Sequence, residues 1–142
     1  STTQPLIKLD GDPQHAGFQF RASNEVASST SKQTFYIRPG EGVDDKGKTK
    51  NWPQDKDMTN LNWKGQSVVV GGQRYYTLYL DHSQNPKPSY YSERDYGRFG
   101  SYFKASVEPD RPLSVRYRLI FGTKELSTIE CQDFSKTFLK DT

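Results

Sequence analysis

The stretch that decides the fold is QSVVVGGQRYYTLYL, residues 66–80. Two runs rich in β-branched and aromatic side chains, residues 66–70 and 75–80, stand on either side of Gly71 and Gly72. Residues of these types favour strands, and a connection of two glycines is typical of a hairpin with a tight primed turn. We therefore expect an antiparallel β-hairpin in the middle of the chain.

Strand patterns recur on both sides of this hairpin. Residues 113–121 alternate between apolar and mostly polar side chains, which is typical of a strand with one buried face. Further runs of strand composition are residues 5–9, 17–22, 34–37 and 100–107. Residues 23–32 are rich in Ser and Thr, and this composition predicts a turn without helix or strand.

A helix is expected only near the end of the sequence, over residues 125–138. Ser127 and Glu130 have the spacing of a capping box. Four side chains at roughly helical spacing are expected to face the sheet: Leu126, Ile129, Phe134 and Phe138. Strands in series followed by one late helix predict a mostly β protein, an antiparallel β-sandwich with one C-terminal helix, in a single domain spanning residues 1–142.

Composition excludes several classes of partner. Hydrophobic content is low at 32%, but aromatic content of 13% and a net charge of only +3 indicate a folded domain with an aromatic core. The 20 basic and 17 acidic residues are interspersed, so no nucleic-acid partner is expected. No apolar stretch approaches the roughly 20 residues of a membrane span, so no membrane partner is expected. The single cysteine, Cys131, excludes an internal disulfide and predicts a buried thiol.

The segment Tyr90–Arg98 gathers three tyrosines, two carboxylates and two arginines, and we expect it to be a loop that forms the functional surface. Glu93 is a candidate for acid/base catalysis. Candidates for substrate contact in this segment are Arg94, Asp95, Tyr96 and Arg98. The alternative is a cluster of structural ion pairs that braces a long connection.

His15 and His82 are the only histidines, and each is expected at a junction between a loop and a strand. Histidine is the usual general base or metal ligand near neutral pH. We consider three roles for both residues: acid/base catalysis, ligation of a single metal ion, and hydrogen-bonded scaffolding. The sequence requires no cofactor.

Trp52 and Trp63, with three asparagines nearby, form a third set. Aromatic faces beside amide groups suit sugar rings, whose C–H faces stack on aromatic rings while their hydroxyls form hydrogen bonds. Trp63 is expected in the core, and Trp52 either binds a ligand or covers an apolar edge.

Two motifs carry a family resemblance: HAGFQFRA at residues 15–22 and SERDYGRFG at residues 92–100. The chain resembles a group of bacterial proteins called PmoA-like, whose label does not describe a methane oxygenase. The resemblance implies a β-sandwich of the galactose-mutarotase-like group, a secreted or periplasmic location and a setting of polysaccharide degradation. Such domains usually carry a further N-terminal β-portion, so part of the cleft is expected from such a portion or from a second subunit.

The leading hypothesis is a carbohydrate-active protein that acts on or binds a glycan used by bacteria for growth. A polar cleft is expected from His15, His82 and the Tyr90–Arg98 segment, with Glu93 as third catalytic residue and Arg21 orienting the substrate. If the protein is an enzyme, it is polysaccharide-active, of hydrolase or lyase type. The alternatives are a non-catalytic carbohydrate-binding module that relies on Trp52, and a metal-dependent oxidative glycan enzyme.

Overall fold

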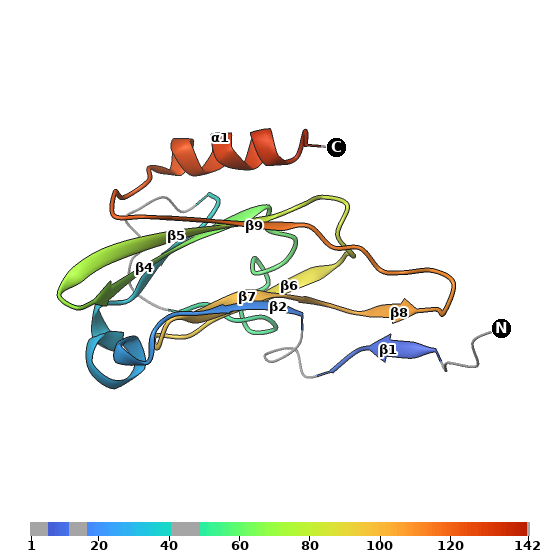
Figure 1. Ribbon diagram of the computed structural model, residues 1–142, viewed down its shortest axis with the longest axis horizontal. Coiled ribbons are helices and arrows are strands. Elements are labelled where there is room, and N and C mark those ends of the chain that lie inside the picture. Colours follow the sequence, from blue (N-terminus) through green and yellow to red (C-terminus); the bar gives the residue numbers. More distant parts are fainter. Residues whose placement is uncertain (1–5, 12–16, 41–48, 142) are drawn as a thin grey trace.

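The computed structural model describes residues 6–11, 17–40 and 49–141, and these form three antiparallel sheets and a C-terminal helix (Figure 1). The four-stranded sheet has the order β3-β4-β5-β9, the three-stranded sheet β2-β7-β6, and the smallest sheet β1-β8. The bounds are β1 Ile7–Leu9, β2 Phe18–Arg21, β3 Phe35–Ile37, β4 Trp63–Val70, β5 Gln73–Asp81, β6 Ser89–Glu93, β7 Arg98–Phe103, β8 Ala105–Val107, β9 Tyr117–Gly122 and α1 Thr128–Phe138. Among these residues no helix is long and apolar enough to cross a membrane.

The predicted central hairpin is confirmed and is longer than expected. β4 and β5 pair from Trp63↔Leu80 to Val70↔Gln73. Gly71 and Gly72 both have positive φ, +57° and +75°, as a type I′ turn requires.

The four-stranded sheet packs between the three-stranded sheet and α1, which confirms the predicted β-sandwich with one C-terminal helix (Figure 1). Successive side chains of a strand point to opposite faces, so Tyr79 faces the other sheet while Leu78 and Leu80 face the helix. The core between the sheets is aromatic, as predicted: Tyr36, Met58, Tyr79, Tyr91 and Phe99. The core under the helix contains Ile37, Trp63, Leu78, Leu80, Cys131 and Phe138.

Helix α1 begins at the predicted capping box, in which the Ser127 hydroxyl accepts from the Glu130 amide. The predicted inward face is wrong for Ile129 and Phe134, which are 74% and 42% exposed. The buried face is instead formed by Cys131, Ser135 and Phe138, whose spacings of four and three residues align them along the helix. Small side chains at two of these positions let the helix approach the sheet closely. Burial raises the pKa of the Cys131 thiol to about 11.

Three other elements differ from the prediction. β9 begins only at Tyr117, because the backbone of Arg116 pairs with a side chain and not with a strand. The Arg116 amide donates to Asn85 Oδ1 at 2.6 Å, and Asn85 Nδ2 donates to the Arg116 carbonyl at 2.7 Å. The run 100–107 divides into β7 and β8, which pair with different strands. Within 23–32, a π-helical turn (Val26–Thr30) and the start of a 3₁₀ turn replace the plain turn.

Candidate functional site

The segment Tyr90–Arg98 is a β-hairpin and not the long loop that the sequence suggested. β6 and β7 pair through it, and the turn is closed by the Arg94 amide donating to the Arg98 carbonyl at 2.9 Å. Alternation along β6 divides its side chains between two environments. Tyr91 and Glu93 point into the sandwich, whereas Tyr90 and Ser92 point to its outer face.

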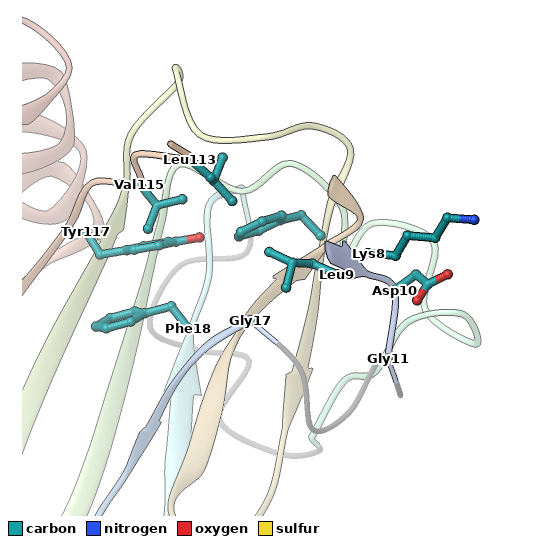
Figure 2. Close-up of a pocket in the computed structure, with 10 residues that line it drawn as sticks. Lys8, Leu9, Asp10, Gly11, Gly17, Phe18, Leu113, Val115 and Tyr117 are labelled. Atoms are coloured by element: carbon teal, nitrogen blue, oxygen red, sulfur yellow. The ribbon is translucent and has the colours of Figure 1, made fainter. Parts of the chain in front are cut away.

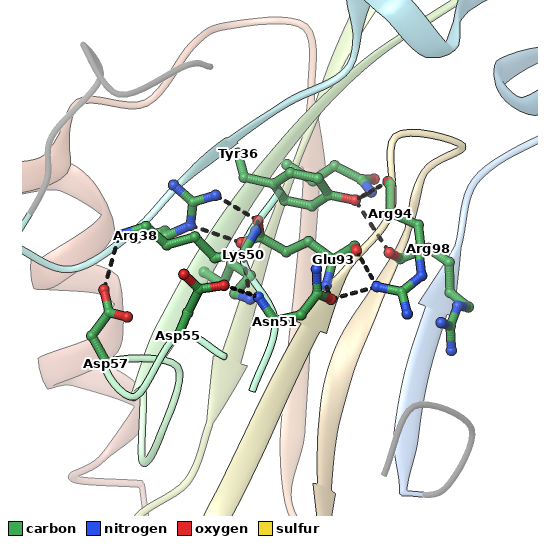
Figure 3. Close-up of polar contacts among 11 residues, drawn as sticks. Tyr36, Arg38, Lys50, Asn51, Asp55, Asp57, Glu93, Arg94 and Arg98 are labelled. Carbon is green, nitrogen blue, oxygen red and sulfur yellow. Dashed lines mark hydrogen bonds and ion pairs between the residues drawn. The ribbon is translucent and has the colours of Figure 1, made fainter. Parts of the chain in front are cut away.

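The inward side of this hairpin carries a buried ionic cluster (Figure 3). The Glu93 carboxylate accepts from Arg38 Nε at 2.9 Å and Nη2 at 2.5 Å, and lies 3.1 Å from Lys64 Nζ. The Lys50 amide donates to the same carboxylate at 2.8 Å. Because Lys64 lies in β4 and Arg38 directly follows β3, both strands of the opposite sheet, the cluster ties the two sheets together.

The cluster fixes the protonation of its members. Burial acts to raise the pKa of Glu93, but Lys64 and Arg38 outweigh it and the pKa is lowered from its usual value. Burial lowers the pKa of Lys64 to about 8, against the opposing effect of Glu93. A general acid at neutral pH needs a raised carboxyl pKa, and the shift of Glu93 has the opposite direction.

Arg94 fastens the segment 49–60 to the hairpin. Its guanidinium donates to the side-chain oxygen of Asn51, which also accepts from the Glu93 amide at 3.0 Å. The backbone amide of Asn51 in turn donates to the Asp55 carboxylate at 2.7 Å (Figure 3). Asp95 is exposed in the turn. Arg94 therefore braces the connection that carries Trp52.

The outer face of the three-stranded sheet has a cationic end. Arg21 of β2 and Arg98 of β7 are register partners. The Arg21 guanidinium lies 5.7 Å from the centre of the Tyr96 ring, and Arg98 Nε donates to the Tyr96 hydroxyl at 3.2 Å. Arg21 is exposed, whereas only 8% of Arg98 is exposed.

The opposite end of the same face is aromatic. Tyr90 and Tyr102 are register partners with ring centres 5.1 Å apart. Trp52 lies over Tyr90 at 4.2 Å, and the Lys56 ammonium lies 5.7 Å from the Trp52 ring. Trp52 and Tyr90 are both half-buried.

A polar row crosses the sheet between these ends. Gln19, Gly100 and Ser92 are register partners in neighbouring strands. A Cβ atom at Gly100 would lie 2.3 Å from the Phe18 carbonyl oxygen, so only glycine fits. The Ser92 hydroxyl is 1% exposed and has no hydrogen-bond partner among the described residues. A buried hydroxyl of this kind is a group that a ligand or a water molecule can satisfy.

His82 does not meet Glu93. His82 packs edge-on against Phe138 at 5.3 Å, on the helix side of the four-stranded sheet, whereas Glu93 lies on the other side. The Gln84 amide donates to His82 Nδ1 at 3.2 Å. The predicted convergence of His82 with Glu93 is therefore not found, and His15 lies outside the described residues. Within the described residues no three His, Cys, Asp or Glu side chains are grouped to hold a metal ion.

A second feature is an open apolar cavity of about 530 Å³ at one end of the sandwich (Figure 2). Phe18 and Tyr117 stack at its wall with ring centres 4.5 Å apart. Leu9, Leu113 and Val115 point into the same space (Figure 2). Lys8 and Asp10 contribute to the rim.

The sequence reasoning missed three residues of these sites: Phe18, Arg38 and Lys64. Asn51, Tyr90 and Ser92 belonged to the predicted sets but were given no individual role. A signal existed for Arg38, because it is a charged residue directly after the apolar run Phe35–Ile37. A charge in such a place must find an opposite charge in the core. The identity of that partner depends on the pairing of distant strands and is not visible locally.

Comparison with known proteins places residues 1–135 under one family model, described as a family of unknown function (DUF6807). No curated protein and no solved structure matches the chain.

Proposed function

We propose that this chain, which belongs to the DUF6807 family, is a carbohydrate-binding protein whose ligand lies on the outer face of the three-stranded sheet. One observation carries the proposal: an arginine end, a polar row and an aromatic end follow one another on that single face. Four of the residues predicted from the sequence take part in this arrangement: Arg21, Trp52, Tyr96 and Arg98.

The order of these groups suits a glycan. Arg98 and Tyr102 are four residues apart on β7. Because residues two apart on a strand are separated by about 6.5–7 Å, the arginine and aromatic ends stand roughly 13–14 Å apart, the length of a short oligosaccharide. Aromatic rings bind the C–H faces of a sugar, and planar guanidinium groups bind carboxylates or hydroxyl pairs. Because the exposed Arg21 guanidinium lies beside the largely buried charge of Arg98, the preferred ligand carries an acidic sugar.

Binding without catalysis fits the described residues best. Glu93 is enclosed with Arg38 and Lys64, and His82 is packed against Phe138, so neither reaches this face. The bacterial, secreted or periplasmic setting and the PmoA-like, galactose-mutarotase-like kinship belong to the same proposal and rest on the sequence motifs alone.

The test is a glycan array followed by calorimetry on neutral and uronate-containing oligosaccharides. Trp52→Ala is expected to weaken binding of every ligand about tenfold, equivalent to about 1.4 kcal/mol. Arg21→Ala is expected to weaken binding of acidic ligands by a similar factor and of neutral ligands far less. His82→Ala should leave the affinity unchanged.

Matched controls separate the site from general surface effects. Tyr75→Ala removes a ring that is 42% exposed on the central hairpin, and Arg111→Ala removes an exposed guanidinium in the turn after β8, outside the three-stranded sheet. Equal effects of the site variants and these controls, or no binding to any glycan, would contradict the proposal.

A further inference from the structure

Two strand edges lie open on the same side of the sandwich. Among the described residues, β2 and β9 each end their sheet without a neighbour on the outer side. They face each other across the gap between the sheets, where Phe18 stacks on Tyr117 at 4.5 Å and Phe20 contacts Phe121 at 5.5 Å. Open strand edges present unpaired backbone donors and acceptors and invite further pairing.

β9 carries a protruding ring at one end and a cavity at the other. Phe121 is 61% exposed. Tyr117, four residues earlier on the same face of the strand, lines the apolar cavity of about 530 Å³ (Figure 2). A projecting aromatic ring and an apolar hollow on one strand edge form a self-complementary surface.

We propose that a second copy of this chain closes this edge by pairing its β9 antiparallel to β9, with Leu119 on the two-fold axis. In an isologous pair each contact occurs twice, so Phe121 of the second copy lies opposite Tyr117 and enters the cavity, and the reverse contact forms as well. Centring on Leu119 keeps Tyr117, Leu119 and Phe121 of both copies on the inner, apolar face.

The charges on the edge agree with this register. Arg118 is paired with Asp141 of its own chain at 2.7 Å. In the proposed register it stands opposite Ile120 of the second copy, so the two arginines are not directly opposed. β9 also contains no lysine or proline, the residues that commonly protect open edges.

Cysteine cross-linking tests the register directly. Leu119→Cys would place two thiols on directly opposite residues, where Cα atoms lie about 4.5–5.5 Å apart, within the range that a disulfide spans. The only native cysteine, Cys131, is buried, so the new thiol is the reactive one. A covalent dimer is expected for Leu119→Cys and not for Ile120→Cys. Cross-linking of Ile120→Cys alone would overturn the register.

Sedimentation analysis over a wide range of protein concentration tests the interface without introducing a disulfide. The unmodified chain is expected to dimerise, and Phe121→Asp to remain monomeric with an unchanged circular dichroism spectrum. The control is Ile129→Asp, which places the same charge at an exposed apolar residue of α1 and should still dimerise. A chain that stays monomeric at all concentrations, or equal behaviour of the two variants, would overturn the proposal. Because the glycan face is elsewhere, either proposal can fail without the other.

Discussion

The Lys64 ammonium lies 3.1 Å from the Glu93 carboxylate, and neither side chain is exposed to solvent. A charge removed from water in this way is tolerated only when it is paired and hydrogen-bonded. Arg38 and the Lys50 backbone amide donate hydrogen bonds to the same carboxylate, so Arg38, Lys64 and Glu93 act as one unit across the two sheets.

Glu93→Gln is expected to destabilise the fold by about 3–5 kcal/mol, because it leaves two buried cations without a counter-charge. The free energy of unfolding in urea measures the effect. Glu130→Gln, at an exposed carboxylate of the capping box, is the control and should change it far less. A loss for Glu93→Gln no larger than for this control would show that the cluster does not hold the sheets together.

Acid should weaken the protein partly through the same carboxylate. The pKa of Glu93 is lowered in the folded state, so at acidic pH the unfolded chain binds more protons at this group. The stabilisation is therefore complete above the unfolded pKa of about 4.5 and is lost as the pH falls through the folded value. Melting temperatures of the native chain and Glu93→Gln, measured from neutral pH to pH 3, should converge on acidification. Parallel curves would contradict this.

Gly97→Ala is expected to destabilise the β6–β7 turn by more than the roughly 1–2 kcal/mol that a left-handed backbone costs an alanine. At φ +82° its Cβ would also lie 2.7 Å from the Cβ of Ala22. Gly71→Ala separates the two causes, because φ is +57° there and nothing lies within 4 Å. Thermal unfolding of both variants should show the larger loss at Gly97, and equal losses would exclude the clash.

Ser127→Ala should cost about 1 kcal/mol through loss of the helix cap. The Ser127 hydroxyl accepts a hydrogen bond from the backbone amide of Glu130 at 3.2 Å and so satisfies a donor in the first turn of α1. Chemical unfolding measures the change, and Ser83→Ala, at an exposed serine outside the helix, is the control. Equal stability of the two variants would mean that packing against the sheet alone sets the helix start.

The elements that the sequence predicted well are those with local signals. The hairpin follows from Gly71 and Gly72 between β-favouring runs, and the helix start follows from Ser127 and Glu130. Both signals lie within a few residues of the element that they specify and depend on local backbone geometry.

The residues that sequence reasoning misplaced depend on long-range register. Which side of the helix is buried follows from how α1 meets the sheet, so Ile129 faces solvent although its spacing suggested otherwise. His82 and Glu93 stand on opposite sides of the four-stranded sheet because side chains alternate along the strand: Asp81 faces Tyr91 of the other sheet, so the next residue, His82, faces the helix. Proximity along the chain therefore misled the expectation of a shared cleft.

The alternation along β6 has a consequence for how such proteins can diverge. Tyr91 and Glu93 are tied to the core, whereas Tyr90 and Ser92, between them in sequence, face outward. Changes at Tyr90, which is half-buried, alter the chemistry presented to the surroundings without disturbing the ionic cluster, whereas Ser92 is only 1% exposed. Descendants of one ancestor can therefore acquire new preferences at Tyr90 while inheriting the same scaffold, and the inward positions are the ones expected to resist drift.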